Sequence, residues 1–214
     1  MTFTRRHALF LGTGAVAAAW LGGPLAALAQ SVDTAKLADS GSDLEEMALG
    51  AADAPVTVIE YASMTCGHCA NFHAATYPAL KAKYIDTGKV RFVLREFPLD
   101  PLAAAAFMLA RCAPGGKYFE TVDLFFERQR DWTQTNDPLG EMLKLAKQAG
   151  FTQEQFEGCL TNQQLLDGIN AVKDKGETEF GVNSTPTFFI NGETLRGAQG
   201  IEAFEQRIDP LLEG

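Results

Sequence analysis

Two cysteines separated by two residues, in the run Cys66-Gly67-His68-Cys69, constrain this chain more than any other feature. An apolar, strand-like run at residues 56–61 precedes them, and a helix-like run at residues 69–84 follows. A dithiol at such a turn lies at a helix N-terminus, where unpaired backbone N–H groups and the helix dipole favour a thiolate over a thiol. Because the thiolate is the nucleophile in disulfide exchange, this placement predicts a redox-active pair.

The order of the two cysteines predicts different roles for them. Cys66, nearest the helix end, should be exposed and act as the nucleophile, whereas Cys69, one turn further in, should be buried and resolve the mixed disulfide. As an imidazolium, His68 would favour the Cys66 thiolate and make the pair a stronger oxidant. The alternative is half of a zinc site, which would need two more ligands at a matching spacing, and Cys112 and Cys159 are not spaced as a pair. We therefore expect neither a metal nor another cofactor.

The first 29 residues are typical of an export signal. Arg5-Arg6 form a short positive region, residues 8–21 are apolar, and Ala27-Leu28-Ala29 matches a cleavage pattern that would leave Gln30 as the new N-terminus. The paired arginines hint at twin-arginine export, with Sec export as the other route. The alternative is an uncleaved membrane anchor over residues 8–29. In either case the folded part should face an oxidising compartment.

The rest of the chain is acidic. After Ala29 it carries 16 basic and 27 acidic side chains, a net charge of −11. Such a surface repels nucleic-acid backbones and anionic lipid, which argues against both as partners. Hydrophobic residues make up 46% of the sequence, which is enough for a core and unlike a disordered chain.

The order of strand and helix signals predicts an α/β chain. Two strands joined by a helix should be parallel, and Asn191-Gly192 between two short apolar runs is typical of a hairpin turn. The predicted parts are the export signal (1–29), a loosely held polar arm (30–47), a strand–helix–strand unit (48–97), a helical block (98–180) and a strand–strand–helix unit (181–214).

Glu60 is a candidate site residue because it lies six residues before Cys66 on the first strand. A buried carboxylate beneath the dithiol has a raised pKa and could take up the proton of Cys69. The alternative is a glutamate near a strand end that reaches water. Periodicity alone leaves both alternatives open.

Thr185-Pro186 precedes the apolar run 187–190, which is a predicted strand. A cis peptide bond here would bring the Thr185 backbone beside the dithiol, with groups exposed for an extended substrate to pair with. A trans proline at a strand entrance is the more common case.

Cys112 and Cys159 both fall in the helical block. In an exported protein two spare cysteines more often pair than stay free, so we expect a disulfide between them. The loop it closes implies about 4 kcal/mol of stabilisation on the chain-entropy model. The alternative is two buried thiols that pack as small apolar residues.

Two further features have structural interpretations. His73, seven residues after Cys66, lies on the same helix face, where we expect a packing or hydrogen-bonding role. Aromatic residues recur at helical spacing over residues 119–126, and we expect them in the core in preference to a peptide-binding patch.

Two motifs together resemble the DsbA-type thiol–disulfide oxidoreductases of the bacterial periplasm. They are residues 54–61 before the dithiol and residues 184–192 near the end, and the similarity covers nearly all of the chain after Ala29. The resemblance implies a thioredoxin-like fold with an inserted helical domain. It also implies the roles of four site features: Cys66 as nucleophile, Cys69 as resolving cysteine, Glu60 as buried acid, and Thr185-Pro186 as a substrate-binding cis-proline loop.

The resemblance further implies a monomeric periplasmic enzyme that donates its disulfide to reduced exported polypeptides and is reoxidised by a membrane partner of the DsbB type. Gly67-His68 departs from the Pro-His of the best-known DsbA proteins and matches protein disulfide isomerase, and Thr185 resembles the DsbC and DsbG isomerases. A reductase or isomerase on the same scaffold is therefore an alternative. About 25 residues precede the first strand after Gln30, too few for the dimerisation domain of those isomerases. A third hypothesis is a non-enzymatic thiolate carrier of Cu(I) or zinc.

Overall fold

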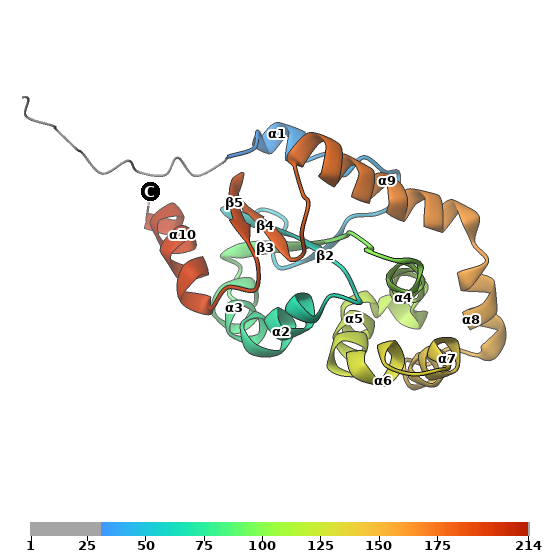
Figure 1. The fold of residues 1–214 in the computed structure, drawn as a ribbon. Helices are drawn as coiled ribbons and strands as arrows, with labels where there is room; N and C mark the ends of the chain where they lie inside the picture. Colours follow the sequence, from blue (N-terminus) through green and yellow to red (C-terminus); the bar gives the residue numbers. More distant parts are fainter. Residues whose placement is uncertain (1–30, 214) are drawn as a thin grey trace, which may run out of the picture.

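A five-stranded mixed sheet forms the centre of the molecule (Figure 1), of which the computed structural model describes residues 31–213. The strand order is β1-β3-β2-β4-β5. β2 and β3 are parallel, and the other neighbours are antiparallel. The strands are β1 Met47–Leu49, β2 Val56–Ala62, β3 Val90–Glu96, β4 Thr187–Ile190 and β5 Glu193–Arg196. The predicted export signal, residues 1–29, lies outside the described residues.

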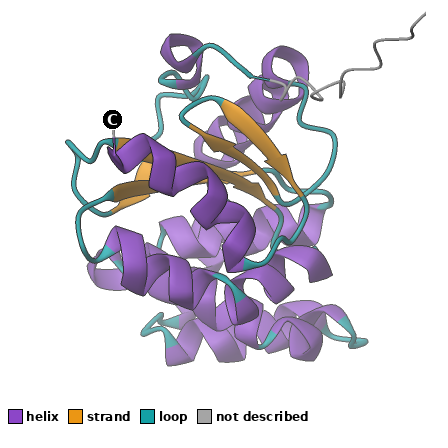
Figure 2. Cartoon of the chain, turned by 90° about the vertical axis from the view of Figure 1, so that its left-hand side faces the viewer, coloured by secondary structure: helices purple, strands orange, loops and turns teal. Residues whose placement is uncertain are grey.

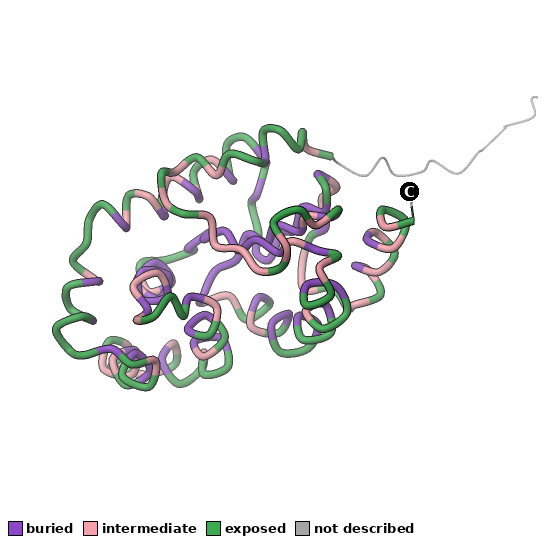
Figure 3. Tube along the Cα trace, turned by 180° about the vertical axis from the view of Figure 1, so that it is seen from behind, coloured by how far each residue is buried: buried purple, intermediate pink, exposed green. Residues whose placement is uncertain are grey.

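Helices cover both faces of the sheet (Figure 2), which explains why β2 and β3 are apolar on both sides. Val58 and Phe92 face a large core that includes side chains of α2, α3 and α10. Ile59 and Val93 face a smaller core under α1 and α9. These helices are α1 Thr34–Leu37, α2 Gly67–Ala75, α3 Tyr77–Leu80, α9 Gln163–Phe180 and α10 Ile201–Glu213. Buried residues gather in the centre of the molecule, between these two layers of helices (Figure 3).

The remaining helices are inserted in the chain between β3 and β4, form a block beside the sheet (Figure 1) and share its larger core. Their starts follow the local signals: Asp100 accepts a hydrogen bond from Ala103 N at 2.8 Å, and Thr152 forms a capping box with Gln155. The aromatic face of α5 is in the core, with Phe125 fully buried. The helices are α4 Pro101–Arg111, α5 Tyr118–Glu127, α6 Gln129–Thr133, α7 Pro138–Gln148 and α8 Gln153–Leu160.

The prediction of a loosely held arm is wrong for residues 31–46. This segment packs on the sheet: Leu37 is buried, and its carbonyl accepts a hydrogen bond from the buried Arg95 guanidinium at 2.6 Å. Arg95 also forms an ion pair with Glu46, just before β1 pairs with β3. The residue that holds the polar arm is Arg95 of β3. Apolar periodicity along the arm itself therefore does not predict that the arm packs on the sheet.

Candidate active site

The dithiol lies where β2 leads into α2. Cys66 is the N-cap residue of α2 with an extended backbone (φ −78°, ψ 117°), and its N–H donates to Ser63 O at 3.0 Å. Both cysteines are free thiols, with Cys66 partly exposed and Cys69 fully buried. The sulfur at the helix end is therefore the one that another molecule can reach.

The surroundings of Cys66 stabilise its thiolate. The pKa of Cys66 is lowered from 9.0 to about 5, and the largest cause is the hydrogen bond from the Cys69 thiol. The Thr185 side chain and the backbone N–H groups of Cys69 and His68 add to the effect, and together they outweigh the partial burial of the sulfur. These N–H groups belong to the first turn of α2, which has no earlier carbonyls to pair with.

The pKa of the Cys69 thiol shifts in the opposite direction to that of Cys66. Burial raises the pKa of the Cys69 thiol well above 9.0, and its hydrogen bond to Cys66 and the charge of Glu60 raise it further. Cys69 therefore holds its proton at neutral pH. It must lose that proton before it can attack a mixed disulfide.

His68 is exposed, and it affects Cys66 through its backbone N–H group. The proposed effect of its imidazolium on the Cys66 thiolate stays a prediction.

The peptide bond between Thr185 and Pro186 is cis. The Cys66 sulfur lies 3.3 Å from the Thr185 carbonyl oxygen, although the two residues are 119 positions apart. The loop is held by hydrogen bonds at both ends, from the Thr187 hydroxyl to Ser184 O at 2.7 Å and from Gly197 N to Pro186 O at 2.8 Å. The loop that starts β4 thus forms one wall beside the reactive sulfur.

Sequence reasoning missed two supports of the dithiol loop. The Gln129 side chain, from α6, donates to Met64 O at 2.7 Å and to Cys66 O at 3.0 Å. The Thr65 hydroxyl donates to the Asp100 carboxylate at 2.6 Å. The same carboxylate caps α4. The helical block therefore fixes the backbone on which Cys66 lies. Both contacts join segments far apart in sequence, and no local motif marks them.

Glu60 is fully buried, which excludes the alternative of a glutamate that reaches water. One carboxylate oxygen, Oε2, lies 3.1 Å from Nε2 of His73, and the other, Oε1, has no hydrogen-bond partner within residues 31–213. His73 Nδ1 lies 3.6 Å from a carboxylate oxygen of Asp123. Burial, the largest influence, lowers the pKa of His73, but the charges of Glu60 and Asp123 outweigh it and raise the value to about 9. His73 is thus an imidazolium at neutral pH.

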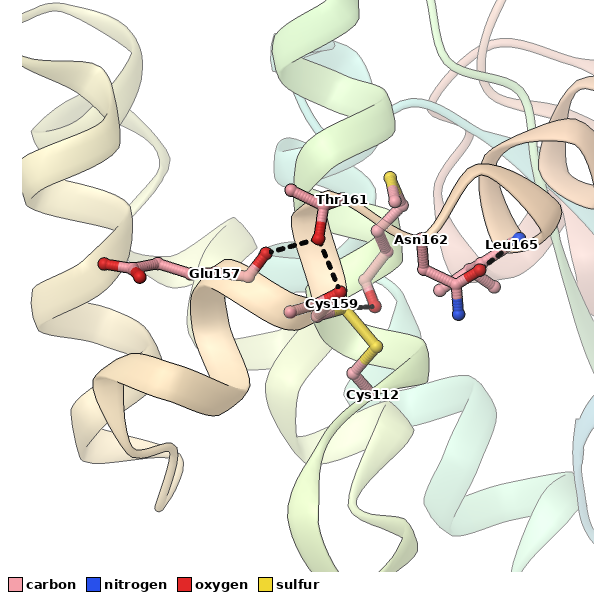
Figure 4. Close-up of a disulfide and its surroundings, with 8 residues drawn as sticks. Cys112, Glu157, Cys159, Thr161, Asn162 and Leu165 are labelled. Carbon is pink, nitrogen blue, oxygen red and sulfur yellow. Dashed lines mark hydrogen bonds between the residues drawn. A yellow bond between two sulfur atoms is a disulfide. The ribbon is translucent and has the colours of Figure 1, made fainter.

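The other two cysteines are joined. Cys112 at the end of α4 and Cys159 in α8 form a disulfide with a Cα–Cα distance of 6.2 Å (Figure 4). It closes a loop across 47 positions and lies within the helical block. This pair connects two helices of the block and is separate from the dithiol.

Comparison with known proteins places the chain in a family. The family model described as thioredoxin matches residues 42–210. The crystal structure of alpha-DsbA1 from Wolbachia pipientis is 32% identical, with a TM-score of 0.75, and the match covers 79% of this chain and 92% of that one. The chain belongs to the DsbA-type thiol–disulfide oxidoreductases. The predicted α/β class, a thioredoxin-like fold with a helical insertion, is confirmed.

Two further proteins are similar to this chain. A "putative protein-disulfide oxidoreductase" of Rickettsia bellii is 31% identical over 172 residues, which is 80% of this chain and 66% of the relative. BdbD from Bacillus subtilis shares the fold, with 22% identity, a TM-score of 0.70 and coverage of 79% of this chain and 94% of that one. The chain spans 66% or less of the length of the Rickettsia relatives it matches.

Residues 31–213 contain no group of three or more His, Cys, Asp or Glu side chains arranged to hold a metal ion. No helix in the same range is both long and apolar enough to cross a membrane.

Proposed function

We propose that the protein oxidises dithiols in exported polypeptides through its Cys66–Cys69 pair. The observation that carries the proposal is the opposite shift of the two thiol pKa values, to about 5 at Cys66 and well above 9.0 at Cys69. A stabilised thiolate is a good leaving group, and its stability favours the reduced form of the enzyme. The oxidised enzyme then tends to pass its disulfide to other proteins.

The reaction has two exchanges. A substrate thiolate attacks the Cys66 sulfur, the Cys66–Cys69 bond breaks, and Cys69 leaves with the electron pair and takes up a proton. A second substrate thiolate then attacks the substrate sulfur of the mixed disulfide, and Cys66 leaves as a thiolate. Two electrons have moved from the substrate to the enzyme. The Thr185-Pro186 loop, with its carbonyl beside Cys66, is the backbone against which we expect an extended substrate to bind.

The reduction potential of the pair, measured against glutathione, tests the direction of the reaction. We expect a value between about −180 mV, typical of protein disulfide isomerase, and about −120 mV, typical of DsbA. A value near about −270 mV, as in thioredoxin, would contradict the oxidase role and favour a reductase or isomerase on the same scaffold. Insulin reduction beside anaerobic Cu(I) titration tests the carrier alternative, which requires tight metal binding without turnover.

A trapping experiment tests the site. In a Cys69→Ser variant, a mixed disulfide formed between Cys66 and a substrate has no neighbouring Cys69 thiol to resolve it, so such species should accumulate at Cys66. Species trapped through Cys112 or Cys159 would contradict the assignment. The matched control is a Cys66→Ser variant, which should trap none.

We also propose where the protein works. The signal-like first 29 residues and the DsbA-type relatives support export to the periplasm by the Sec or the Tat route, action as a monomer, and reoxidation by a DsbB-type membrane protein. Cell fractionation, with the N-terminus of the exported form sequenced, tests the compartment. Recovery in the cytoplasm with residues 1–29 intact would contradict it.

A further inference from the structure

A buried thiol that must lose its proton needs an acceptor. Cys69 is fully buried and lies one turn before His73 on α2, so the Glu60 carboxylate that contacts His73 lies under the same face of the helix. The charge of Glu60 raises the pKa of the Cys69 thiol. The Glu60 oxygen Oε1 has no partner in the described part of the chain, although it is buried. A buried carboxylate oxygen without a donor is costly, and it is free to receive a proton.

The other oxygen of Glu60 is the first of a series of contacts that reaches the surface. Oε2 contacts Nε2 of His73, whose second nitrogen, Nδ1, lies 3.6 Å from Asp123. The side chain of Asp123 is 53% exposed, whereas those of His73 and Glu60 are 3% and 0% exposed. The three groups therefore connect the interior below the dithiol to the surface between α2 and α5.

The position of the imidazole is fixed by its neighbours. Its ring centroid lies 4.4 Å from that of Phe126 on α5 and 4.9 Å from that of Tyr77 on α3. Beyond it is a surface cavity of about 370 Å³, whose charged lining residues besides Asp123 are Lys81 and Glu127. The charged and titratable groups that border His73 and this cavity are Glu60 from β2, Tyr77 from α3, Lys81 after it, and Asp123 and Glu127 from α5.

We propose that Glu60, His73 and Asp123 form a relay that exchanges one proton between Cys69 and solvent. The net charge of the buried Glu60–His73 pair stays zero throughout. The proposal rests on the proposed function, since it concerns the proton that Cys69 takes up when a substrate breaks the Cys66–Cys69 bond and gives up when that bond forms again. His73 acts in it as a positioning residue, because it keeps its hydrogen bond to Glu60, exchanges its Nδ1 proton with the surface and does not contact the reacting sulfurs.

The relay begins with Glu60 as a carboxylate and His73 as an imidazolium. As Cys69 attacks Cys66, its thiol proton passes to Glu60 Oε1, the Cys66–Cys69 bond forms, and the partner sulfur leaves as a thiolate. The imidazolium gives its Nδ1 proton to Asp123 or to water in the cavity. Glu60 is then a neutral acid and His73 a neutral imidazole. In the reverse reaction Glu60 returns its proton to the Cys69 thiolate, and His73 takes up a proton at Nδ1.

The two transfers belong together for an electrostatic reason. If Glu60 took a proton while His73 kept both of its own, an unpaired imidazolium would remain in a buried site, which is strongly unfavourable. Loss of the Nδ1 proton removes that charge. Asp123 provides the acceptor at the surface, so the interior pair has zero net charge before and after each turnover.

A His73→Gln variant tests the relay. Glutamine can keep a hydrogen bond to Glu60 but cannot exchange a proton. The measurement is the rate at which Cys69 resolves a Cys66–glutathione mixed disulfide in the full chain, from about pH 5 to about pH 9. We expect a loss of about a hundredfold at neutral pH, at the lower end of what positioned proton transfer contributes, and a changed pH profile. The thiolate titration of Cys66, followed by ultraviolet absorbance, should stay unchanged, which a merely structural disturbance would not allow.

Two surface variants complete the experiment. Asp123→Asn should lower the resolving rate by less than His73→Gln, because water can accept part of the proton flux, and added imidazole buffer should restore it. Glu127→Gln, on the same helix and in the same cavity, should resolve at the wild-type rate. If His73→Gln does not fold, the Asp123→Asn result decides, because that side chain is half exposed.

Three results would overturn the relay: a wild-type rate and pH profile in His73→Gln, a wild-type rate without buffer response in Asp123→Asn, or equal losses in Asp123→Asn and Glu127→Gln. Failure of the proposed function looks different. In that case the wild-type protein would form no mixed disulfide at Cys66, or its reduction potential would be close to that of thioredoxin, and neither result depends on His73 or Asp123.

Discussion

The two cysteine pairs of this chain lie at opposite ends of helices. Cys66 is the N-cap of α2, where backbone N–H groups face the sulfur, whereas Cys112 is the C-cap of α4 and Cys159 lies in the last turn of α8. A helix C-terminus presents carbonyl oxygens and a negative dipole end, which disfavour a thiolate. The first pair is poised for exchange, and the second remains a stable link.

The surroundings of the two pairs also favour exchange at the first pair and a stable link at the second. The Cys66 sulfur is partly exposed and contacts the cis-proline loop, whereas Cys159 is buried and bonded across 47 positions of the chain. The reactive pair closes almost no loop, so its formation and cleavage change the chain entropy little. The second pair removes much of the freedom of the unfolded chain. Helix end, exposure and loop length therefore separate a catalytic disulfide from a structural one.

The largest expected effect is on activity. Cys66→Ser removes the nucleophile, so we expect complete loss of oxidation of a dithiol peptide, because Cys69 is buried and holds its proton. The matched control is the double variant Cys112→Ala, Cys159→Ala, which should oxidise the peptide at the wild-type rate per folded molecule. Residual exchange in Cys66→Ser, or an inactive but folded control, would break the distinction between the pairs.

The second effect is on stability. The double variant Cys112→Ala, Cys159→Ala should lose about 4 kcal/mol of unfolding free energy, the chain-entropy value for a loop of this length. Denaturant unfolding measures it, with the Cys66–Cys69 pair held in the same redox state in both proteins. A loss close to zero would mean that the helical block is held by its apolar core alone.

The third effect is a pH dependence that only the first pair can produce. Folding lowers the pKa of Cys66 from 9.0 to about 5, so the reduced fold gains stability that is fully present above about pH 9 and is lost as the pH falls through about 5. Cys69, whose pKa is raised, contributes a pH dependence only above that window. We therefore expect the free energy of unfolding of the reduced protein to fall, relative to that of the oxidised protein, from about pH 9 to about pH 5.

Denaturant unfolding of both redox forms at each pH measures this difference. Groups such as His73 titrate in both forms, so their contributions largely cancel in the subtraction. The Cys112–Cys159 disulfide does not titrate. A difference that is independent of pH would contradict a stabilised Cys66 thiolate.

The sequence was sufficient for those parts of the molecule that depend on local patterns. The strand before the dithiol, the capped helices after Asp100 and Thr152, and the hairpin at Asn191-Gly192 follow from residue order and turn chemistry. The two motifs together also indicated the family. Each of these features is set by residues within a few positions of one another.

The contacts that complete the site could not be predicted in this way. Gln129 binds the Cys66 carbonyl, and Asp123 faces His73, because the helical block packs beside α2. The ordered arm depends on Arg95, a buried cation near the end of β3. Such partners lie tens of positions apart, and their meeting depends on tertiary packing that no single segment encodes.

The smallest expected effect concerns how finely the first pair is tuned. Among the groups that lower the pKa of Cys66, the Thr185 side chain comes second, after the hydrogen bond from Cys69. Valine has a similar shape without the hydroxyl, so Thr185→Val should raise the pKa of Cys66 by about one pH unit or less, worth at most about 1.4 kcal/mol, and leave the fold intact. The reduced enzyme would then be less favoured and the protein a weaker oxidant.

The thiolate absorbance of Cys66, titrated in the reduced protein, measures the change. Cys69→Ala is the matched comparison, because it removes the donor with the largest effect on Cys66 and should raise the pKa further than Thr185→Val does. If Thr185→Val has the larger effect, the cis-proline loop and not the Cys69 thiol in the first turn of α2 dominates the tuning of the reactive sulfur. The contrast between helix ends would then explain the inert pair better than the reactive one.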